Sequence, residues 1–296
     1  MTQTDPHPNK STNVRSIGWR ALHATFRAGE ALSPELAGQA AATLFCTTGR
    51  VRRPPAEHAL LAHGRRLGVG RLAAWSFGRG PAVLLVHGWN GRGAQLGALV
   101  PELVENGRRV VLFDAPAHGD SPGRTTTLVH MADAVCAVAH AAGGIEAVVA
   151  HSLGGPATTV AIARGLSVER LVYVGSPVDP SSWVDLLADA LGLGDDARAH
   201  MLRAIEARAG MPLAKLDLVR LAGTMRAPLL VAHDRTDREV PWRAGRALVD
   251  AWPNAALLTT EGLGHRRILR DPAVIGAAVA FLTGAPARAR TASLAT

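Results

Sequence analysis

The chain contains little cysteine, few aromatic residues and almost no lysine. Of its 296 residues, two are cysteine, one is tyrosine, and aromatic residues make up 4%. So few cysteines exclude a small scaffold held together by disulfides, and we expect Cys46 and Cys136 to be buried free thiols in a reducing compartment. The lack of aromatic side chains leaves few surfaces on which nucleic-acid bases could stack.

The positive charge comes almost entirely from arginine. The formal net charge is +8, yet lysine occurs only at Lys10 and Lys215. A positive balance can attract nucleic acid or an anionic membrane surface. Here the arginines are scattered along the sequence and form no basic face interleaved with aromatic residues. We therefore expect no nucleic-acid partner.

Long apolar runs and recognisable cofactor motifs are also missing. No run approaches the roughly 18 to 20 residues that a membrane span requires. Residues 1–16 lack the apolar centre of a secretory signal. The sequence has neither a phosphate-binding loop nor a dinucleotide fingerprint, and its histidines show no metal-binding spacing. These features predict a soluble cytoplasmic protein that uses no metal and no cofactor.

The sequence does contain a regular alternation of short apolar runs and helix-like segments. Strands that alternate with helices predict an α/β fold with a mostly parallel central sheet, covered by helices on both faces. The six expected strands are Ala82–Val86, Arg109–Phe113, Ala147–Ala150, Leu171–Gly175, Pro228–Ala232 and Ala255–Thr259. The expected helices between the first four are Gly93–Asn106, Leu128–Ala142 and Gly155–Gly165. Before this repeat, His58–Arg66 and Arg71–Gly78 are expected to form two further strands.

The remaining segments suggest additions to this core. We expect residues 1–50 to form a disordered tail followed by helix, residues 51–283 the main domain, and residues 284–296 a flexible tail. Residues 181–226 are too many for a simple crossover, which predicts a helical cap inserted above the sheet. Its helices are expected at Ser182–Leu191, Asp195–Ala209 and Leu213–Met225, and its underside is expected to help line the substrate pocket through Trp183, Leu186, Leu187, Met201, Leu202 and Ile205.

The most informative stretch is Ala150-His151-Ser152-Leu153-Gly154-Gly155, which lies between an expected strand and an expected helix. A strand that turns sharply into a helix needs small residues on both sides of the turning residue, and Ala150 and Gly154 meet that need. The pattern therefore predicts Ser152 as a nucleophile. It also places the Leu153 N–H at a helix N-terminus, where developing negative charge is stabilised.

An acid and a histidine follow later strands, in the order serine, acid, histidine. Because ligand sites in such sheets lie at the carboxyl ends of the strands, these residues are expected to meet there. A serine hydroxyl needs a base to accept its proton, and the base needs a carboxylate to orient it. His265 is the expected base. Asp237 is the expected acid, with Asp234 and Asp179 as alternatives.

Together these segments resemble a serine-dependent α/β-hydrolase of the esterase and lipase kind, from about His58 to Leu282. The matching features are Val86-His87-Gly88-Trp89, Asp114 to Ser121, Ala150 to Gly155, Asp237 to Pro241 and Gly264-His265. The resemblance implies that the Trp89 N–H is a second oxyanion donor beside that of Leu153. It also implies loop-structuring or pocket-lining roles for His87, His118 and His151.

The activity that the resemblance implies is hydrolysis of a carboxylic ester of a small or medium-sized molecule through an acyl-enzyme. The same three residues could serve a thioesterase, an acyltransferase or a carbon–carbon bond hydrolase. Outside the enzymes, the alternative is a binding protein that keeps the fold without turnover. Neither the natural substrate nor the oligomeric state follows from the sequence.

Overall fold

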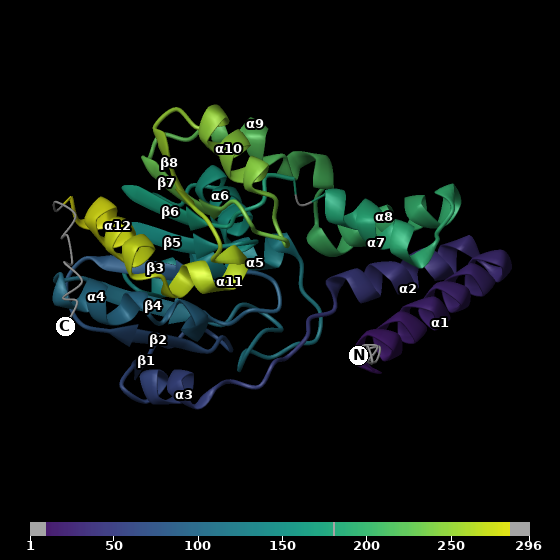
Figure 1. The fold of residues 1–296 in the computed structure, drawn as a ribbon, viewed down its shortest axis with the longest axis horizontal. Coiled ribbons are helices and arrows are strands. Elements are labelled where there is room, and N and C mark those ends of the chain that lie inside the picture. The colour runs from purple at the N-terminus through teal and green to yellow at the C-terminus, as the bar shows by residue number, and fades with distance from the viewer. Residues whose placement is uncertain (1–9, 180, 285–296) are drawn as a thin grey trace, which may run out of the picture. The chain divides into compact units, whose positions relative to one another are not determined.

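An eight-stranded sheet forms the centre of the larger of two compact units, Thr47–Pro180 with Pro212–Thr296 (Figure 1). The computed structural model describes residues 10–179 and 181–284. The strand order is β1-β2-β4-β3-β5-β6-β7-β8. Strand β2 is antiparallel to β1 and β4, and all other neighbours are parallel. This confirms the predicted α/β class and mostly parallel sheet.

The strands of the repeat lie close to their predicted positions. Their bounds are β1 Arg65–Arg66, β2 Ala74–Phe77, β3 Ala82–Val86, β4 Arg109–Phe113, β5 Ala147–His151, β6 Arg170–Val174, β7 Leu229–Asp234 and β8 Ala255–Thr260. The expectation of a strand over His58–Arg66 is wrong, because most of that segment belongs to helix α3 (Pro55–Ala62). Pro55 occupies the start of this helix, where its missing N–H does no harm, and Glu57 in the first turn complements the helix dipole.

Helices cover both faces of the sheet. The helical elements of this unit are η1 Gly93–Leu96, α4 Leu99–Glu105, α5 Leu128–Ala141, α6 Gly154–Ala163, η2 Leu213–Leu216, α9 Leu218–Ala222, α10 Trp242–Ala251, α11 Gly264–Arg267, η3 Ile268–Arg270 and α12 Pro272–Thr283, besides α3. Helices α4 and α12 pack together on one face, and α5 packs against α6 on the other (Figure 1). With both faces covered, the central strands are apolar throughout rather than alternating.

The register of the parallel strands brings their carboxyl ends to one edge. Val86 of β3 pairs with Ala150 of β5, and His151 of β5 pairs with Val174 of β6. At the far side, Asp234 of β7 pairs with Thr260 of β8. The loops that follow these strands therefore leave the sheet at the same edge, which is where the predicted site residues lie.

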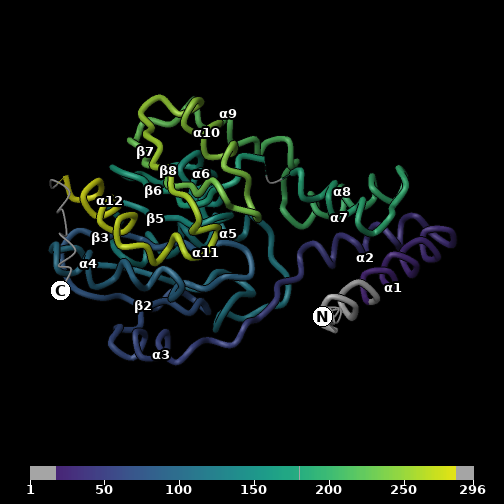
Figure 2. Tube along the Cα trace, in the orientation of Figure 1, coloured from purple at the N-terminus to yellow at the C-terminus, as the bar shows by residue number. Residues whose placement is uncertain are grey.

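The smaller unit combines Met1–Cys46 with Ser181–Met211. It contains α1 (Lys10–Leu32), α2 (Pro34–Cys46), α7 (Ser182–Leu191) and α8 (Asp195–Ala209). Helices α1 and α2 lie side by side, as the purple trace in Figure 2 shows, and α2 packs along α8. Helices α7 and α8 have the bounds predicted for the cap. The third expected cap helix is divided into η2 and α9, and both belong to the larger unit.

The expected terminal segments can be compared only in part. Helix α1 begins at Lys10, so part of the expected N-terminal tail is helical. Residues 1–9 and 285–296, which hold the rest of the expected tails, lie outside the described residues. Among the six expected pocket-lining residues, Met201 and Ile205 are buried on α8, whereas Leu186 and Leu202 are exposed. Within the described residues, no helix has the length and apolar character needed to cross a membrane.

Helix α2 approaches α8 closely at Gly38. A Cβ atom on Gly38 would lie 2.5 Å from the carbonyl oxygen of Ala197 and 2.5 Å from the Cβ atom of His200. Only a glycine fits this contact without a shift of one helix. Gly29, inside α1, offers a matched comparison because a Cβ there would meet nothing within 4 Å.

We therefore expect opposite effects from the same substitution at these two helix positions. Alanine favours a helix over glycine by up to about 1 kcal/mol, so Gly29→Ala should raise the free energy of unfolding. Gly38→Ala should lower it by about 1 to 3 kcal/mol, because overpacking outweighs the gain in helix propensity. Urea unfolding of both variants measures the difference. Equal stabilisation by the two substitutions would contradict the close α2–α8 contact.

Candidate active site

Ser152 lies at a sharp turn between β5 and α6. Its φ angle is +52°, a left-handed conformation that residues other than glycine rarely adopt. The Ser152 N–H donates to the carbonyl of Val174 in β6, at 2.9 Å, and its own carbonyl accepts from the Gly155 N–H at 3.0 Å. These bonds hold the turn from both sides. They give Ser152 the backbone geometry that a nucleophile elbow requires.

Two glycines allow the backbone to crowd around this turn. A Cβ on Gly154 would lie 2.6 Å from the carbonyl oxygen of Val86 in β3, so α6 can begin here only without a side chain. A Cβ on Gly88 would lie 2.6 Å from the Cβ atom of Ser152. The loop that carries Trp89 therefore runs in contact with the serine.

The predicted acid and base are hydrogen-bonded. The Nδ1–H of His265, in α11, donates to Oδ2 of Asp237 at 2.7 Å, and both side chains are buried. This bond places the proton on Nδ1 and leaves Nε2 as the acceptor nitrogen. Gly175, at φ +56°, faces the pair, and a Cβ there would lie 3.1 Å from Nδ1. The structure thus selects Asp237 among the three candidate acids as the partner of His265.

The carboxylate of Asp237 is well supplied with donors. Its Oδ1 accepts the N–H groups of Glu239 and Val240 at 2.8 and 2.9 Å. His233, buried at the end of β7, holds its Nε2 3.5 Å from Oδ2. Burial opposes ionisation, but the hydrogen bonds from His233, His265 and Val240 outweigh it and hold the pKa of Asp237 well below its usual range. Asp237 therefore stays negatively charged.

Asp234, unlike Asp237, bonds to loop residues and not to His265. One of its carboxylate oxygens accepts from the N–H and hydroxyl of Thr236, and the other accepts from Thr260 and from the Leu263 N–H. Burial raises the pKa of Asp234, but these bonds together lower it far below its usual range. Asp234 thus ties the end of β7 to the loop that carries His265. Asp179, the other alternative, is exposed.

Ser152 and His265 are connected through His151, the last residue of β5. The Nε2–H of His151 donates to the carbonyl of His265 at 2.9 Å, and the two rings lie 4.6 Å apart between centroids. Across residues 10–179 and 181–284, no direct hydrogen bond joins the Ser152 hydroxyl to the His265 ring. Catalytic hydrogen bonds are often long without substrate and shorten when it binds.

Two nearby residues were not singled out from the sequence. Oε2 of Glu239 lies 4.0 Å from Nε2 of His265, and its carboxylate also pairs with Arg266. His233 contacts Asp237, as described above. Both belong to the loop after β7 or to the end of that strand, and their proximity to the predicted acid was the available signal.

The expected oxyanion donors belong to two segments that meet at Ser152. Leu153 is the N-cap residue of α6, and Trp89 follows Gly88 in the loop after β3. The Trp89 ring meets the ring of His118 edge-on, with centroids 5.4 Å apart. His87, His118 and His151 are all buried. Burial lowers the pKa of His87 to about 4, and burial lowers those of His118 and His151 to about 3.

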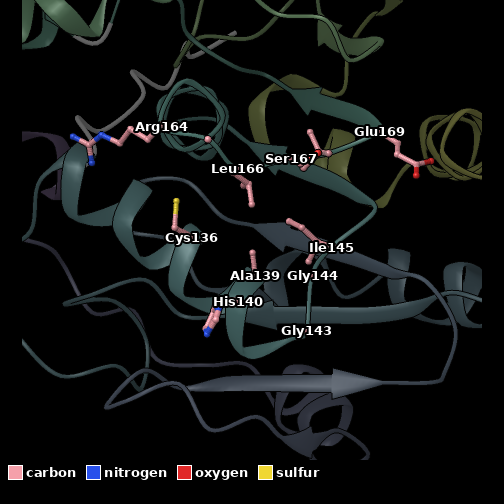
Figure 3. Close-up of a pocket in the computed structure, with 12 residues that line it drawn as sticks. Cys136, Ala139, His140, Gly143, Gly144, Ile145, Arg164, Leu166, Ser167 and Glu169 are labelled. Atoms are coloured by element: carbon pink, nitrogen blue, oxygen red, sulfur yellow. The ribbon is translucent and has the colours of Figure 1, made fainter.

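A separate cavity of about 660 Å³ lies away from these residues (Figure 3). It is lined by the ends of α5 and α6 and by the segments that lead into β5 and β6, including Cys136, His140 and Ser167. The cavity is therefore at the amino-terminal edge of the sheet. Cys136 is half-buried rather than buried, and both cysteines are free. In the part of the chain that the structure describes, no three histidine, cysteine or acidic side chains are grouped as metal ligands.

Comparisons with known proteins agree with this architecture. The α/β hydrolase fold family matches residues 81–198. A pimeloyl-[acyl-carrier protein] methyl ester esterase of Xanthomonas campestris is 32% identical over 231 residues, which cover 65% of this chain and 90% of that protein. The chain belongs to the α/β-hydrolase fold family. It is a hydrolase, as the sequence predicted.

Solved structures share the fold at lower identity. A monoacylglycerol lipase from Paleococcus ferrophilus aligns with a TM-score of 0.56 and 22% identity, over 72% of this chain and 98% of that chain. A bromoperoxidase from Bacillus anthracis aligns with a TM-score of 0.56 and 17% identity, over 75% and 99%. At these identities the likeness concerns the fold alone.

The buried histidines predict how stability depends on pH. In the unfolded chain their rings bind protons below about pH 6.5, whereas burial in the folded protein delays protonation of His87, His118 and His151 to about pH 3 to 4. The unfolded state therefore binds more protons between these limits. The free energy of unfolding should be highest above pH 6.5 and should fall with acidification, by at most about 1.4 kcal/mol per pH unit for each histidine.

Urea unfolding between about pH 5 and 6.5 measures this slope, because carboxyl groups titrate mostly below that window. His118→Gln should remove one titrating ring and reduce the slope by about a third. His130→Gln, which alters an exposed histidine of α5, should leave the slope unchanged. A free energy of unfolding that does not vary with pH in this window would contradict the neutral state of the three rings.

Proposed function

We propose that the chain hydrolyses carboxylic esters of small or medium-sized molecules through an acyl-enzyme on Ser152. The observation that carries the proposal is the 2.7 Å bond between His265 Nδ1 and Asp237 Oδ2 at the same sheet edge as a serine with φ +52°. His265 is the general base and Asp237 the acid that orients it. No cofactor takes part in this scheme.

In the first half of the reaction, the Ser152 hydroxyl oxygen attacks the ester carbonyl carbon. Its proton passes to Nε2 of His265, and the resulting imidazolium is stabilised by the Asp237 carboxylate. The carbonyl oxygen becomes an oxyanion that accepts the N–H groups of Trp89 and Leu153. When the tetrahedral intermediate collapses, the alcohol leaves with the proton from His265.

In the second half, water replaces the serine hydroxyl as the nucleophile. His265 takes a proton from the water as it attacks the acyl carbon, and then returns that proton to Ser152 as the acid product leaves. The buried, ionised state of Asp237 keeps Nδ1 protonated throughout, so Nε2 remains the nitrogen that exchanges protons.

The esterase relative favours an oxygen ester among the possible substrates. The relative described above, of which the chain covers 90%, is named a methyl ester esterase. The thioesterase, acyltransferase and carbon–carbon hydrolase alternatives would use the same three residues. No observation on this chain favours any of them over the ester.

The proposal predicts that Ser152→Ala abolishes hydrolysis of a short p-nitrophenyl ester while the fold is kept. The turnover number should fall by at least about 10⁴-fold, because the hydroxyl forms the covalent bond. A fluorophosphonate probe should label wild-type enzyme at Ser152, shown by peptide mapping, and should not label the variant. Ser167→Ala, at the opposite edge of the sheet, should behave as wild type. Retained turnover or labelling in Ser152→Ala would overturn the proposal.

The division of work between the two acids of one loop gives another prediction. Asp237→Asn should lower the turnover number by about 10⁴-fold, because an amide offers the wrong hydrogen-bonding partner to the His265 ring. Asp234→Asn should chiefly lower the melting temperature and affect turnover much less, since its four contacts anchor a loop. Steady-state kinetics and thermal unfolding of both variants test this. The reverse ranking of turnover numbers would assign the orienting role to Asp234.

A further inference from the structure

Two loops at the carboxyl edge of the sheet each contain a buried histidine whose ring bonds to the backbone of the other loop. The loop after β3 contains His87 and Asn90, and the loop after β4 contains Ala115 and His118. Nε2 of His87 accepts the Ala115 N–H at 2.9 Å, so a ring of the first loop holds the backbone of the second. Nε2 of His118 accepts the Asn90 N–H at 3.0 Å, so a ring of the second loop holds the backbone of the first.

The second nitrogen of each ring is also engaged. The Nδ1–H of His87 donates to the Gly88 carbonyl at 2.7 Å, and that of His118 donates to the Pro116 carbonyl at 3.0 Å. Because a carbonyl can only accept, both rings carry their proton on Nδ1 and present a lone pair at Nε2. The rings also contact each other, with centroids 5.0 Å apart. We name this arrangement of His87 and His118 the histidine clasp.

We propose that the histidine clasp holds the Trp89 N–H in the position where it receives the oxyanion, which makes His87 and His118 positioning residues. This inference rests on the serine mechanism proposed above. Neither ring exchanges protons with the substrate in this role, because every ring nitrogen is occupied by the backbone.

The contacts of His118 converge on the expected donor. Its ring lies edge-on to the Trp89 side chain, and its Nε2 holds the N–H of the next residue, Asn90. Asn90 has φ +54°, a left-handed conformation that asparagine adopts more readily than other residues with a side chain. The Asn90 side chain contributes by accepting the Gly49 N–H at 2.6 Å. The chain is thus held on the carboxyl side of the Trp89 N–H.

The other end of the loop is fixed against the nucleophile. Gly88 precedes Trp89, and a Cβ on it would lie 3.1 Å from the Ser152 hydroxyl oxygen. The Gly88 carbonyl is also the acceptor for His87. A small displacement of this loop would therefore move the Trp89 N–H relative to Ser152, and oxyanion stabilisation depends on donors placed 2.7 to 3.1 Å from the developing charge.

The Asp114 carboxylate makes further hydrogen bonds that join the loops of the histidine clasp. Asp114, buried at the end of β4, accepts the Gly93 N–H at 2.8 Å on one oxygen and the Asp120 N–H at 2.9 Å on the other. Arg53 pairs with the same carboxylate at 2.8 Å. These bonds join the same two loops farther from Ser152. His87 bonds to the carbonyl of the peptide that carries the Trp89 N–H, and His118 bonds to the N–H of the next peptide.

The clasp requires uncharged rings, because an imidazolium cannot accept an N–H. Burial lowers the pKa of both histidines, and neighbouring positive charges act in the same direction, Arg92 on His87 and Arg50 on His118. Asp114 acts in the opposite direction on His118 and is outweighed. The two acceptor nitrogens are therefore available above about pH 4.

A matched pair of substitutions at His118 tests the proposal. Leucine fills the space but accepts no hydrogen bond, whereas glutamine can accept the Asn90 N–H with its oxygen and donate to the Pro116 carbonyl with its nitrogen. His118→Leu should lower the turnover number on a short p-nitrophenyl ester by about 10 to 10³-fold, the upper bound being complete loss of one oxyanion donor, with little change in KM. His118→Gln should recover most of that loss.

A further measurement separates positioning from a purely structural role. An alkylboronic acid forms a tetrahedral adduct on the serine and places an oxygen in the oxyanion hole, so its affinity should fall in His118→Leu in parallel with kcat/KM. His130→Leu, an exposed histidine of α5, should keep wild-type values for both. Should His118→Leu fail to fold, His118→Asn takes its place, because its shorter amide cannot reach both partners.

The outcomes distinguish the clasp from the mechanism on which it rests. If the wild-type enzyme is not labelled by a fluorophosphonate at Ser152, the proposed function itself is overturned. If the wild type is labelled, a folded His118→Leu with wild-type turnover and boronate affinity overturns the clasp alone. A loss of turnover with unchanged boronate affinity also overturns it, because the oxyanion donor would then be in place.

Discussion

The candidate site depends on one close approach of backbone to backbone, where α6 begins beside the end of β3. Gly154 allows this approach, since a side chain there would collide with the carbonyl oxygens of Val86 and His87. The approach leaves Ser152 at φ +52° and brings the loop that starts at His87 against it. The proposed nucleophile and its expected oxyanion donors therefore share one packing constraint, and a residue larger than glycine at position 154 would disturb all of them together.

Around this contact, the loops are held by buried polar side chains bonded to backbone, a pattern that buried polar groups require. The two acids of the β7 loop divide the work, because Asp234 anchors the chain that carries His265 while Asp237 orients its ring. The histidines are divided in a similar way. His265 bonds through Nδ1 to the Asp237 side chain, whereas His87, His118 and His151 use ring nitrogens to hold main-chain groups. The neutrality of His151, whose ring centroid lies 4.6 Å from that of His265, also avoids a second positive charge beside the imidazolium of the proposed mechanism.

Most of the core could be predicted because its signals are local. Short apolar runs predicted the bounds of β3 and β4 correctly. Because parallel strands end at the same edge of a sheet, the loops that follow them could also be predicted to meet there. Local patterns failed where a short amphipathic run suits a strand or a helix equally, as at His58–Ala62. They favoured Asp237 and left Asp234 as an alternative, because the two acids lie three residues apart at and after the end of β7 and only the direction of each carboxylate separates them. The bonds from the rings of His87 and His118 to the backbone of the opposite loop join residues 28 positions apart, and no local sequence pattern predicts such contacts.

The smaller unit is built from two separate segments of the chain, which affects how it folds during synthesis. Its two segments, Met1–Cys46 and Ser181–Met211, are separated by residues 47–180. Ala41 and Ala42 of α2 are fully buried in the finished protein, and α2 packs mainly on α8. A ribosome that adds about 5 to 20 residues per second needs on the order of 10 s or more to synthesise the chain from the end of α2 to the end of α8. During that interval the first helices of the newborn chain lack the surface that stabilises them, so this unit is completed only after much of the sheet has been synthesised.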